Sequence, residues 1–311
     1  MGPAAADAGG LGGRGNPGHP GDPGEPGAMR RRRVVVTGAG LVSPLGDSPA
    51  ALHQALAEGR TGRRPVELRP AEARVEMRCR LAGEVRPFDP QAYVGDRNLR
   101  PLDRTSRLLV VAAQLALADS GWTAEQCARR EVGLVLGTTF CGLRTIAEFD
   151  RRGLRLGPSH ASPMDFANSV INAAAGQAAI WHGLRGVNST VAAGEASGLL
   201  ALAQAADLIR GGRAAALLAG GAEELCFESF FGFYRAGRLC GSAAGAGSGE
   251  ADAEEVPIPF DARRNGYSLS EGAALLMLED AAAAAARGAT VRAELLGHGT
   301  AFDVSGAGLA A

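Results

Sequence analysis

The seven residues Ala192-Ala-Gly-Glu-Ala-Ser-Gly198 join two segments of opposite character. The segment before them, Gly186-Val-Asn-Ser-Thr-Val191, contains β-branched residues, whereas residues 199–210 are rich in alanine and leucine. This order predicts a strand, a tight turn and a helix. A side chain on the first turn of that helix would lie in the positive field of the helix N-terminus, which stabilises a negative charge. Glu195 is therefore the first candidate for a functional residue.

The composition allows the chain to bury a sizeable hydrophobic core. Its 311 residues have a formal net charge of −1 and a hydrophobic content of 46%, which is enough for one large or two modest domains. No run approaches the ~18 apolar residues of a membrane span, and the N-terminus has no apolar segment of the secretory type. We therefore expect a cytoplasmic protein with no membrane partner.

Residue types exclude several classes of function. All 32 basic residues are arginine, so Schiff-base chemistry and a lysine-dependent phosphate loop are excluded. Acidic residues balance the basic ones and aromatic residues are only 5%, which argues against nucleic-acid binding. The five cysteines have no C-x-x-C spacing, so we predict no disulfide framework, no metal site and no cofactor. They are Cys79, Cys127, Cys141, Cys226 and Cys240.

The first 28 residues differ from the rest of the chain. Four G-x-P triplets, beginning at Gly15, have a collagen-like period but are too few for a triple helix. We predict a disordered tail over residues 1–28. Met29 comes directly before four arginines and the first predicted strand, and we expect it to be the biological start. A domain is predicted over residues 29–300, with a flexible Gly/Ala/acidic loop at 241–255.

Strands and helices alternate from residue 34 onward. Continuously apolar strands that alternate with helices predict an α/β fold whose sheet is covered on both faces. The predicted strands are residues 34–36, 132–136, 187–191, 214–219, 272–278 and 291–297. The predicted helices are residues 49–57, 104–120, 169–181, 195–210 and 279–287.

Two short glycine motifs fail as known functional signatures. The stretch from Thr37 to Gly46 follows a strand as a dinucleotide-binding loop does, but Ser43 replaces the third glycine and Pro44 disfavours the helix that should follow. In the turn after residue 191, Ser197 is one position out of step with the G-x-S-x-G nucleophile elbow. We therefore disfavour both a nicotinamide site and a nucleophilic serine.

Five segments, in order, resemble those of the β-ketoacyl-acyl-carrier-protein synthases. The first resembles V-V-T-G-x-G-x-x-S-P-x-G, and the last resembles P-F-D-x-x-R-x-G-F…G-E-G-A with Ser270 in place of one glycine. The segments are Val34–Gly46, Ser162–Phe166 with Asn172–Gln177, Ala192–Gly198, Leu218–Glu223, and Pro259–Tyr267 with Glu271–Ala273. The resemblance implies a thiolase-like layered α-β-α-β-α fold built from two similar halves.

The resemblance also shows what this chain lacks. The family has a nucleophilic cysteine at the position of Glu195, and two histidines and a lysine in its second half that drive decarboxylation of the malonyl extender. We therefore expect the first half of the fold, with residues 301–311 as the start of the second half. None of the chain's histidines matches a catalytic motif; they are His19, His53, His160, His182 and His298.

Several roles remain open for a family member without its cysteine. Attack of Glu195 on a thioester would give a mixed anhydride that water destroys, so we do not expect acyl capture or condensation by this chain alone. The resemblance favours a chain length factor, the non-cysteine subunit that pairs with an active synthase. The alternatives are a malonyl-carrier decarboxylase, which needs the histidines and an oxyanion hole, a split synthase, and a decayed fragment in which Glu195 is only a first-turn acid.

A chain length factor implies partners and a set of bulky residues. The partners would be an acyl carrier protein and an active synthase subunit in a heterodimer, or a homodimer, in fatty acid or polyketide biosynthesis. Phe140, in the loop after a central strand, is the candidate gate of the acyl tunnel, and Met164 and Phe166 match the segment that faces the partner. Ordinary core packing is the alternative for all three. Cys141 is not at a helix N-terminus, so we do not expect a relocated nucleophile there.

Overall fold

The computed structural model describes residues 32–66, 77–242 and 255–301 of the chain. Four predictions fall wholly or mostly outside these residues. They are the disordered tail over residues 1–28, the start at Met29, most of the flexible loop at 241–255, and the start of a second half at 301–311.

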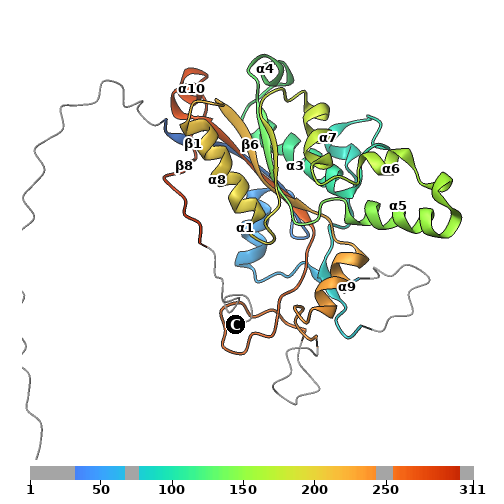
Figure 1. Ribbon diagram of the computed structural model, residues 1–311. Helices are drawn as coiled ribbons and strands as arrows, with labels where there is room; N and C mark the ends of the chain where they lie inside the picture. Colours follow the sequence, from blue (N-terminus) through green and yellow to red (C-terminus); the bar gives the residue numbers. More distant parts are fainter. Residues whose placement is uncertain (1–31, 67–76, 243–254, 302–311) are drawn as a thin grey trace, which may run out of the picture. The chain divides into compact units, whose positions relative to one another are not determined.

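A six-stranded mixed sheet forms the centre of the described part (Figure 1), in the order β5-β4-β6-β7-β1-β8. Strands β5, β4 and β6 are parallel, and β7 is antiparallel to both β6 and β1. The strands are β1 (Val34–Val42), β4 (Gly133–Gly137), β5 (Asn188–Val191), β6 (Ala216–Glu223), β7 (Gly272–Asp280) and β8 (Ala293–Glu294). A separate two-stranded sheet pairs β2 (Arg63–Pro65) with β3 (Leu81–Gly83).

Helices cover both faces of the large sheet (Figure 1). Alternate residues of β4 show this, because Leu134 and Leu136 belong to the hydrophobic core under α3 and α7, whereas Val135 belongs to the core under α8. The helices are α1 (Pro49–Ala57), α2 (Gln91–Val94), α3 (Arg104–Asp119), α4 (Ala124–Arg129), α5 (Leu143–Leu156), α6 (Pro163–Ala167), α7 (Ala173–His182), α8 (Ser197–Arg210), α9 (Phe227–Arg235) and α10 (Ala281–Ala286), with a 3-10 turn at Pro158–His160.

The α/β architecture is as predicted, and the helix at residues 49–57 has the predicted bounds. Three helix starts were wrong, those of α7, α8 and α10. Helix α8 begins at Ser197, not at Glu195, because the chain first makes a turn with Gly194 at a φ of 60°. Helix α10 begins at Ala281, because residues 279 and 280 still pair with β1 and the Asp280 carboxylate caps the helix.

Other elements differ in length from the predictions, and some were not predicted. Helix α7 begins four residues later than predicted, and the last predicted strand is reduced to Ala293–Glu294. Helices α5 and α9 were missed. Helix α5 buries none of its residues, so it lies on the surface and contributes little to the core.

The glycines after the first strand are explained by packing. Gly38 and Gly40 lie inside β1, which α3 crosses. A Cβ atom at Gly40 would collide with the backbone oxygen of Ala112 and the backbone nitrogen of Ala116. Glycine is therefore needed for the close approach of strand and helix.

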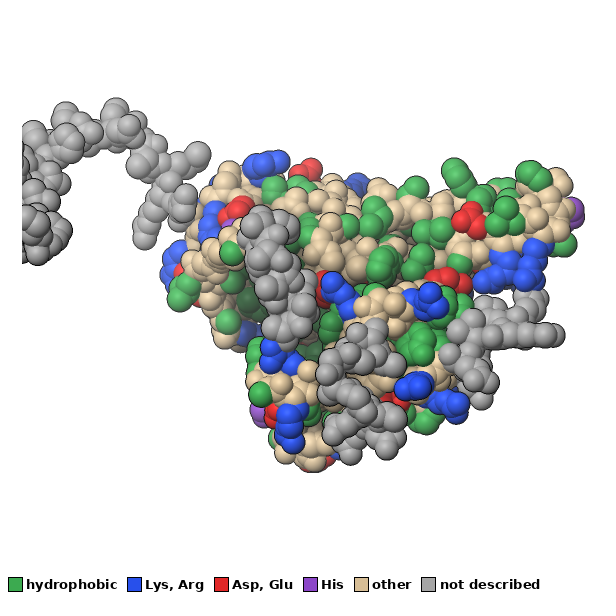
Figure 2. All heavy atoms as spheres, turned by 60° about the horizontal axis from the view of Figure 1, so that its bottom comes forward, with side chains coloured by type: hydrophobic (Ala, Val, Ile, Leu, Met, Phe, Trp, Pro, Cys, Tyr) green, Lys and Arg blue, Asp and Glu red, His purple; other side chains and the backbone are tan. Residues whose placement is uncertain are grey.

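The charged side chains on the surface are dispersed. Arginines pair with nearby acidic residues at several points, for example Arg129 with Glu125 on α4. On the face drawn in Figure 2, basic side chains form separate groups with hydrophobic side chains between them. The described side chains on this face therefore form no continuous basic stripe.

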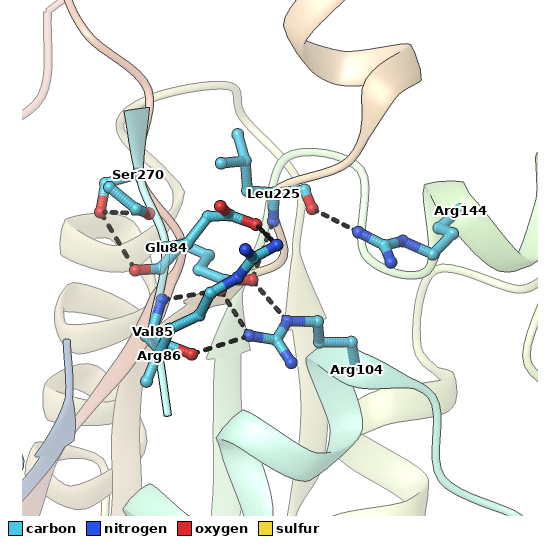
Figure 3. A network of polar contacts seen from close by, with 9 residues as sticks. Glu84, Val85, Arg86, Arg104, Arg144, Leu225 and Ser270 are labelled. Carbon is cyan, nitrogen blue, oxygen red and sulfur yellow. Dashed lines mark hydrogen bonds and ion pairs between the residues drawn. The ribbon is translucent and has the colours of Figure 1, made fainter. Parts of the chain in front are cut away.

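One buried carboxylate ties four segments together beside the sheet (Figure 3). Glu271 accepts two hydrogen bonds from Arg104 at 2.6 and 2.7 Å, and two from the backbone N–H groups of Val85 (2.8 Å) and Leu225 (3.3 Å). Its side chain is 1% exposed. The hydrogen bond to Glu271 raises the pKa of Arg104, which keeps the guanidinium charged. The start of β7, the start of α3, the segment after β3 and the loop before α9 are thus held at one point.

Glu224 is a second buried carboxyl group, and it is only partly satisfied. Its Oε1 accepts the backbone N–H of Arg144 at 2.9 Å, whereas Oε2 has no hydrogen-bond partner. Burial raises the pKa of Glu224 to about 7. This residue therefore makes stability depend on pH near neutrality.

We predict that Gly40→Ala lowers the free energy of unfolding by about 1–3 kcal/mol, because the added methyl group forces β1 and α3 apart. The matched control is Gly153→Ala on α5, where a Cβ meets no atom within 4 Å. There the change should raise stability by about 0.5–1 kcal/mol through helix propensity. Urea unfolding of both variants measures the difference. Equal effects at the two positions would contradict the packing role of Gly40.

Glu224→Gln should remove part of the pH dependence of stability. The pKa of this group is raised from 4.5 to about 7, so between these values the folded protein binds the proton more tightly than the unfolded chain. Stability from this group is present below pH 4.5 and is lost as the pH rises through about 7.

The neutral glutamine escapes this loss. From pH 4 to pH 8 the variant should gain up to about 3 kcal/mol relative to the unmodified protein, measured by urea unfolding at each pH. The control is Glu125→Gln on α4. The Glu125 side chain is 71% exposed, so this substitution removes no buried carboxyl group. Parallel stability curves for Glu224→Gln and the unmodified protein would show that the group titrates alike in the folded and unfolded states.

Candidate functional site

Two adjoining cavities lie at the carboxyl ends of the parallel strands β4 and β6, the edge at which α/β sheets bind ligands. The larger has a volume of about 380 Å³ and the smaller about 170 Å³. Their shared lining residues are Thr139, Glu195, Glu223 and Ser270. Glu195 therefore lies where the two cavities meet.

The turn before α8 is fixed by a serine. The Ser197 hydroxyl donates to the carbonyl oxygen of Gly194 at 2.6 Å and accepts the backbone N–H of Ala193 at 2.8 Å. Ser197 is buried. Its hydroxyl is thus occupied by the turn, in agreement with the exclusion of a nucleophilic serine.

Glu195 lies before α8, with its side chain 53% exposed. Its Oε1 accepts a hydrogen bond from the Tyr267 hydroxyl at 3.2 Å and lies 3.6 Å from Arg238 Nη1. Glu195 is therefore not on the first turn of α8, as predicted, but directly precedes the N-cap residue Ala196. Its partners, an arginine and a tyrosine, come from a distant part of the chain.

The loop that carries Phe140 is held by Glu223, at the end of β6. The carboxylate accepts the backbone N–H groups of Thr139 (2.6 Å) and Phe140 (3.3 Å) and the hydroxyl of Thr138 (3.0 Å). Burial raises the pKa of Glu223, and these hydrogen bonds oppose the rise. The Thr139 hydroxyl also donates to Gly194 at 3.2 Å, which joins this loop to the turn before α8.

Phe140 lines the smaller cavity. Its ring packs edge-to-face on Phe233 of α9, with ring centroids 6.2 Å apart and an interplanar angle of 81°. It is 39% exposed. The ring therefore stands at the cavity wall and is not part of the closed core.

Met164 and Phe166 lie on α6, away from the cavities. They are 53% and 62% exposed, and neither lines the larger or the smaller cavity. Phe166 contacts Phe149 of α5, with centroids 5.9 Å apart. Core packing does not account for either residue, because both present their side chains to the surface.

The cysteines offer no reactive thiolate. All five are free and buried, and burial raises the pKa of every one of them. For Cys141, beside Phe140, the pKa is about 12. A thiol with such a pKa is protonated at neutral pH and is a poor nucleophile. The reason differs from the one expected, because Cys141 directly precedes the N-cap residue of α5 and burial raises its pKa.

Four of the five histidines lie in the described residues, and none of them lines either cavity. His53 is on α1 and His160 is in the 3-10 turn. Burial lowers the pKa of His182 to about 4, and its Nε2–H donates to the carbonyl oxygen of Val110 at 2.9 Å. His298 is 3.1 Å from Asp207, near the far end of α8.

In the described segments, no group of three His, Cys, Asp or Glu side chains could hold a metal ion. None of the helices described is long and apolar enough to cross a membrane.

Sequence reasoning missed three residues of this site: Phe233, Arg238 and Tyr267. Tyr267 and Glu195 are 72 positions apart, so no local pattern connects them. One signal was present, because Tyr267 stands where the family form P-F-D-x-x-R-x-G-F has phenylalanine.

Comparison with known proteins gives consistent matches. "Beta-ketoacyl synthase, N-terminal domain" matches residues 31–284. The 3-oxoacyl-[acyl-carrier-protein] synthase 2 of Synechocystis sp. is 31% identical over 276 residues, which cover 88% of this chain and 64% of that protein. The corresponding protein of Vibrio harveyi is 34% identical over 278 residues, with the same coverage. The chain thus spans a little less than two thirds of these relatives.

Solved structures agree. The ishigamide ketosynthase/chain length factor has a TM-score of 0.73 at 31% identity and covers 86% of this chain and 63% of that one. AntDE:AntF, a type II polyketide synthase acyl-carrier protein in complex with its ketosynthase bound to the hexaketide, has a TM-score of 0.67 at 26% identity and covers 85% and 62%. Because the N-terminal domain of the β-ketoacyl synthases matches most of this chain, the chain belongs to the β-ketoacyl synthase family.

Proposed function

We propose that this chain is a non-condensing β-ketoacyl synthase homologue of fatty acid or polyketide biosynthesis, and that it acts as the partner or chain-length subunit of an active synthase. One observation carries the proposal. Where the family resemblance implies a nucleophilic cysteine, this chain has Glu195, whose carboxylate is paired with Tyr267 and Arg238.

Neither Ser197 nor Cys141 is suited to take over acyl capture. The Ser197 hydroxyl is occupied within the turn, and Cys141 is buried with a pKa of about 12. Attack of the Glu195 carboxylate on a thioester would displace the thiolate and give a mixed anhydride, which water hydrolyses. A role in shaping an acyl cavity needs no nucleophile, and it fits a cavity wall formed by Phe140 and Phe233.

Exposed apolar side chains support a protein partner. Between residues 164 and 180, on α6, α7 and the segment joining them, five large apolar side chains are at least 43% exposed. They are Met164, Phe166, Val170, Ile171 and Ile180. Monomeric proteins rarely expose large contiguous patches of apolar side chains. Helix α7 contacts β5, which is the edge strand of the sheet, and edge strands are sites of pairing with another chain. We propose this region, the 164–180 surface, as the contact with the synthase subunit.

An acyl carrier protein is the second proposed partner. Its support is the similarity to AntDE:AntF, a complex that contains an acyl-carrier protein. No observation favours malonyl decarboxylation, because His182 and His298 are both engaged away from Glu195.

The proposal is tested by co-expression of the full chain with an active ketoacyl synthase subunit, followed by size-exclusion chromatography with mass determination. We expect a 1:1 heteromer. Ile180→Glu should weaken it at least about tenfold, because a charge would be buried without a partner. Leu56→Glu on α1 is the matched control, since Leu56 is also exposed, at 61%, but lies outside the 164–180 surface.

Three results would decide against this proposal in different ways. Separate elution of the two chains would contradict a partner subunit. Equal weakening of the heteromer by Ile180→Glu and Leu56→Glu would contradict the assignment of the 164–180 surface as the contact. A stable dimer of this chain alone that excludes the synthase would replace the heterodimer by a homodimer.

A further inference from the structure

Two departures from the family's sequence form meet in the structure. Glu195 replaces the cysteine of the turn, and Tyr267 replaces the final phenylalanine of the P-F-D-x-x-R-x-G-F block. The hydroxyl that distinguishes tyrosine from phenylalanine lies 3.2 Å from Glu195 Oε1. This hydrogen bond exists only when both departures are present, because cysteine and phenylalanine supply neither the carboxylate nor the hydroxyl.

The backbone fixes the position of the tyrosine. Tyr267 N–H donates to the carbonyl oxygen of Arg238 at 3.0 Å, and its carbonyl oxygen accepts from Cys240 at 3.0 Å. The Arg238 guanidinium lies 3.5 Å from the Tyr267 hydroxyl and 3.6 Å from Glu195. Burial is the main cause of the raised pKa of Tyr267, so the hydroxyl keeps its proton and remains a donor at neutral pH.

An aromatic series connects this hydrogen bond to the candidate gate. The Tyr267 ring packs edge-to-face on Phe233, with centroids 5.7 Å apart, and Phe233 packs edge-to-face on Phe140 at 6.2 Å. Edge-to-face contacts are directional, so a rotation of one ring changes the preferred position of the next. All three rings line the smaller cavity, and so does Glu195.

The smaller cavity is small for an acyl chain. Its volume of about 170 Å³ is below the roughly 300–1,000 Å³ of common ligand pockets. A long acyl chain can therefore enter only if a wall residue moves. Phe140 is the candidate, because it is 39% exposed and has space outside the cavity.

We propose that Glu195 is a positioning residue: through its hydrogen bond to Tyr267 and the ring of Phe233, it holds Phe140 at the wall of the smaller cavity and so restricts the length of an acyl group bound there. The acyl group as occupant rests on the proposed function. The coupling between Glu195 and Phe140 does not, and it can be measured in the full chain alone.

The coupling is tested by fluorine NMR of the full chain labelled with 4-fluorophenylalanine, in which Phe140→Leu identifies the Phe140 resonance. Tyr267→Phe removes only the hydroxyl and restores the family residue, so the variant should fold. We expect it to shift or broaden the Phe140 resonance, with a change of roughly two- to five-fold in the ratio of ring positions, the scale of a half-exposed pair.

Further variants separate the hydrogen bond from a general structural effect. Glu195→Ala should reproduce the change, and the double variant should add nothing to it. Glu195→Gln, which keeps an acceptor, should retain the original resonance. Phe149 is an internal control, because it packs on Phe166 outside the series. An unmoved Phe140 resonance in both Tyr267→Phe and Glu195→Ala would overturn the proposal.

A binding measurement separates this inference from the proposed function. The probes are butanoyl and octanoyl thioesters of N-acetylcysteamine, titrated calorimetrically into the chain and its Tyr267→Phe variant. We expect the variant to prefer octanoyl over butanoyl by roughly two- to five-fold more than the original chain. A moved Phe140 ring without changed selectivity would retain the coupling and overturn its effect on acyl length. Unchanged resonances in a chain that still forms the heteromer would overturn the coupling and leave the proposed function standing.

Discussion

The site depends on the hydrogen bonds that the buried Glu271 carboxylate accepts. A charge removed from water is tolerated only when it is paired and hydrogen-bonded, and Glu271 receives both hydrogen bonds of Arg104 and two backbone N–H groups. Loss of one partner of such a pair costs about 3–5 kcal/mol. The same four hydrogen bonds fix the start of β7 beside the larger cavity, and Ser270, the preceding residue, lines both cavities. Stability and site geometry therefore have the same origin.

The half-buried carboxyl group of Glu223 performs the corresponding role for the loop of Phe140. Glu223 holds three consecutive residues, 138 to 140, and the Thr139 hydroxyl joins this loop to Gly194. The turn before α8 and the candidate gate are therefore parts of one polar network. In this setting Glu195 is not an isolated acid. Its carboxylate completes the contact with Tyr267, and the cavities meet at its side chain.

The fold could be predicted from sequence to a large extent, because its signals are local. Alternating apolar strands and helices specify the α/β sheet, and the helix at residues 49–57 has both a serine cap and Pro49 at its start. The site could be predicted only in part. Glu195 was identified, but its surroundings were not, because the Ser197 hydrogen bonds decide where α8 begins and Tyr267 approaches from 72 residues away. Phe140 was predicted as the gate and lines the smaller cavity, whereas Met164 and Phe166, predicted to face a partner, lie on α6 and line neither cavity.

The central claim is that this chain shapes an acyl site without carrying an acyl group. Intact-protein mass spectrometry tests it most directly, after the complex of this chain with an active ketoacyl synthase subunit is treated with an octanoyl-acyl-carrier-protein thioester. The account predicts that the octanoyl mass appears on the synthase subunit and that the mass of this chain is unchanged. An octanoyl adduct on this chain would contradict it.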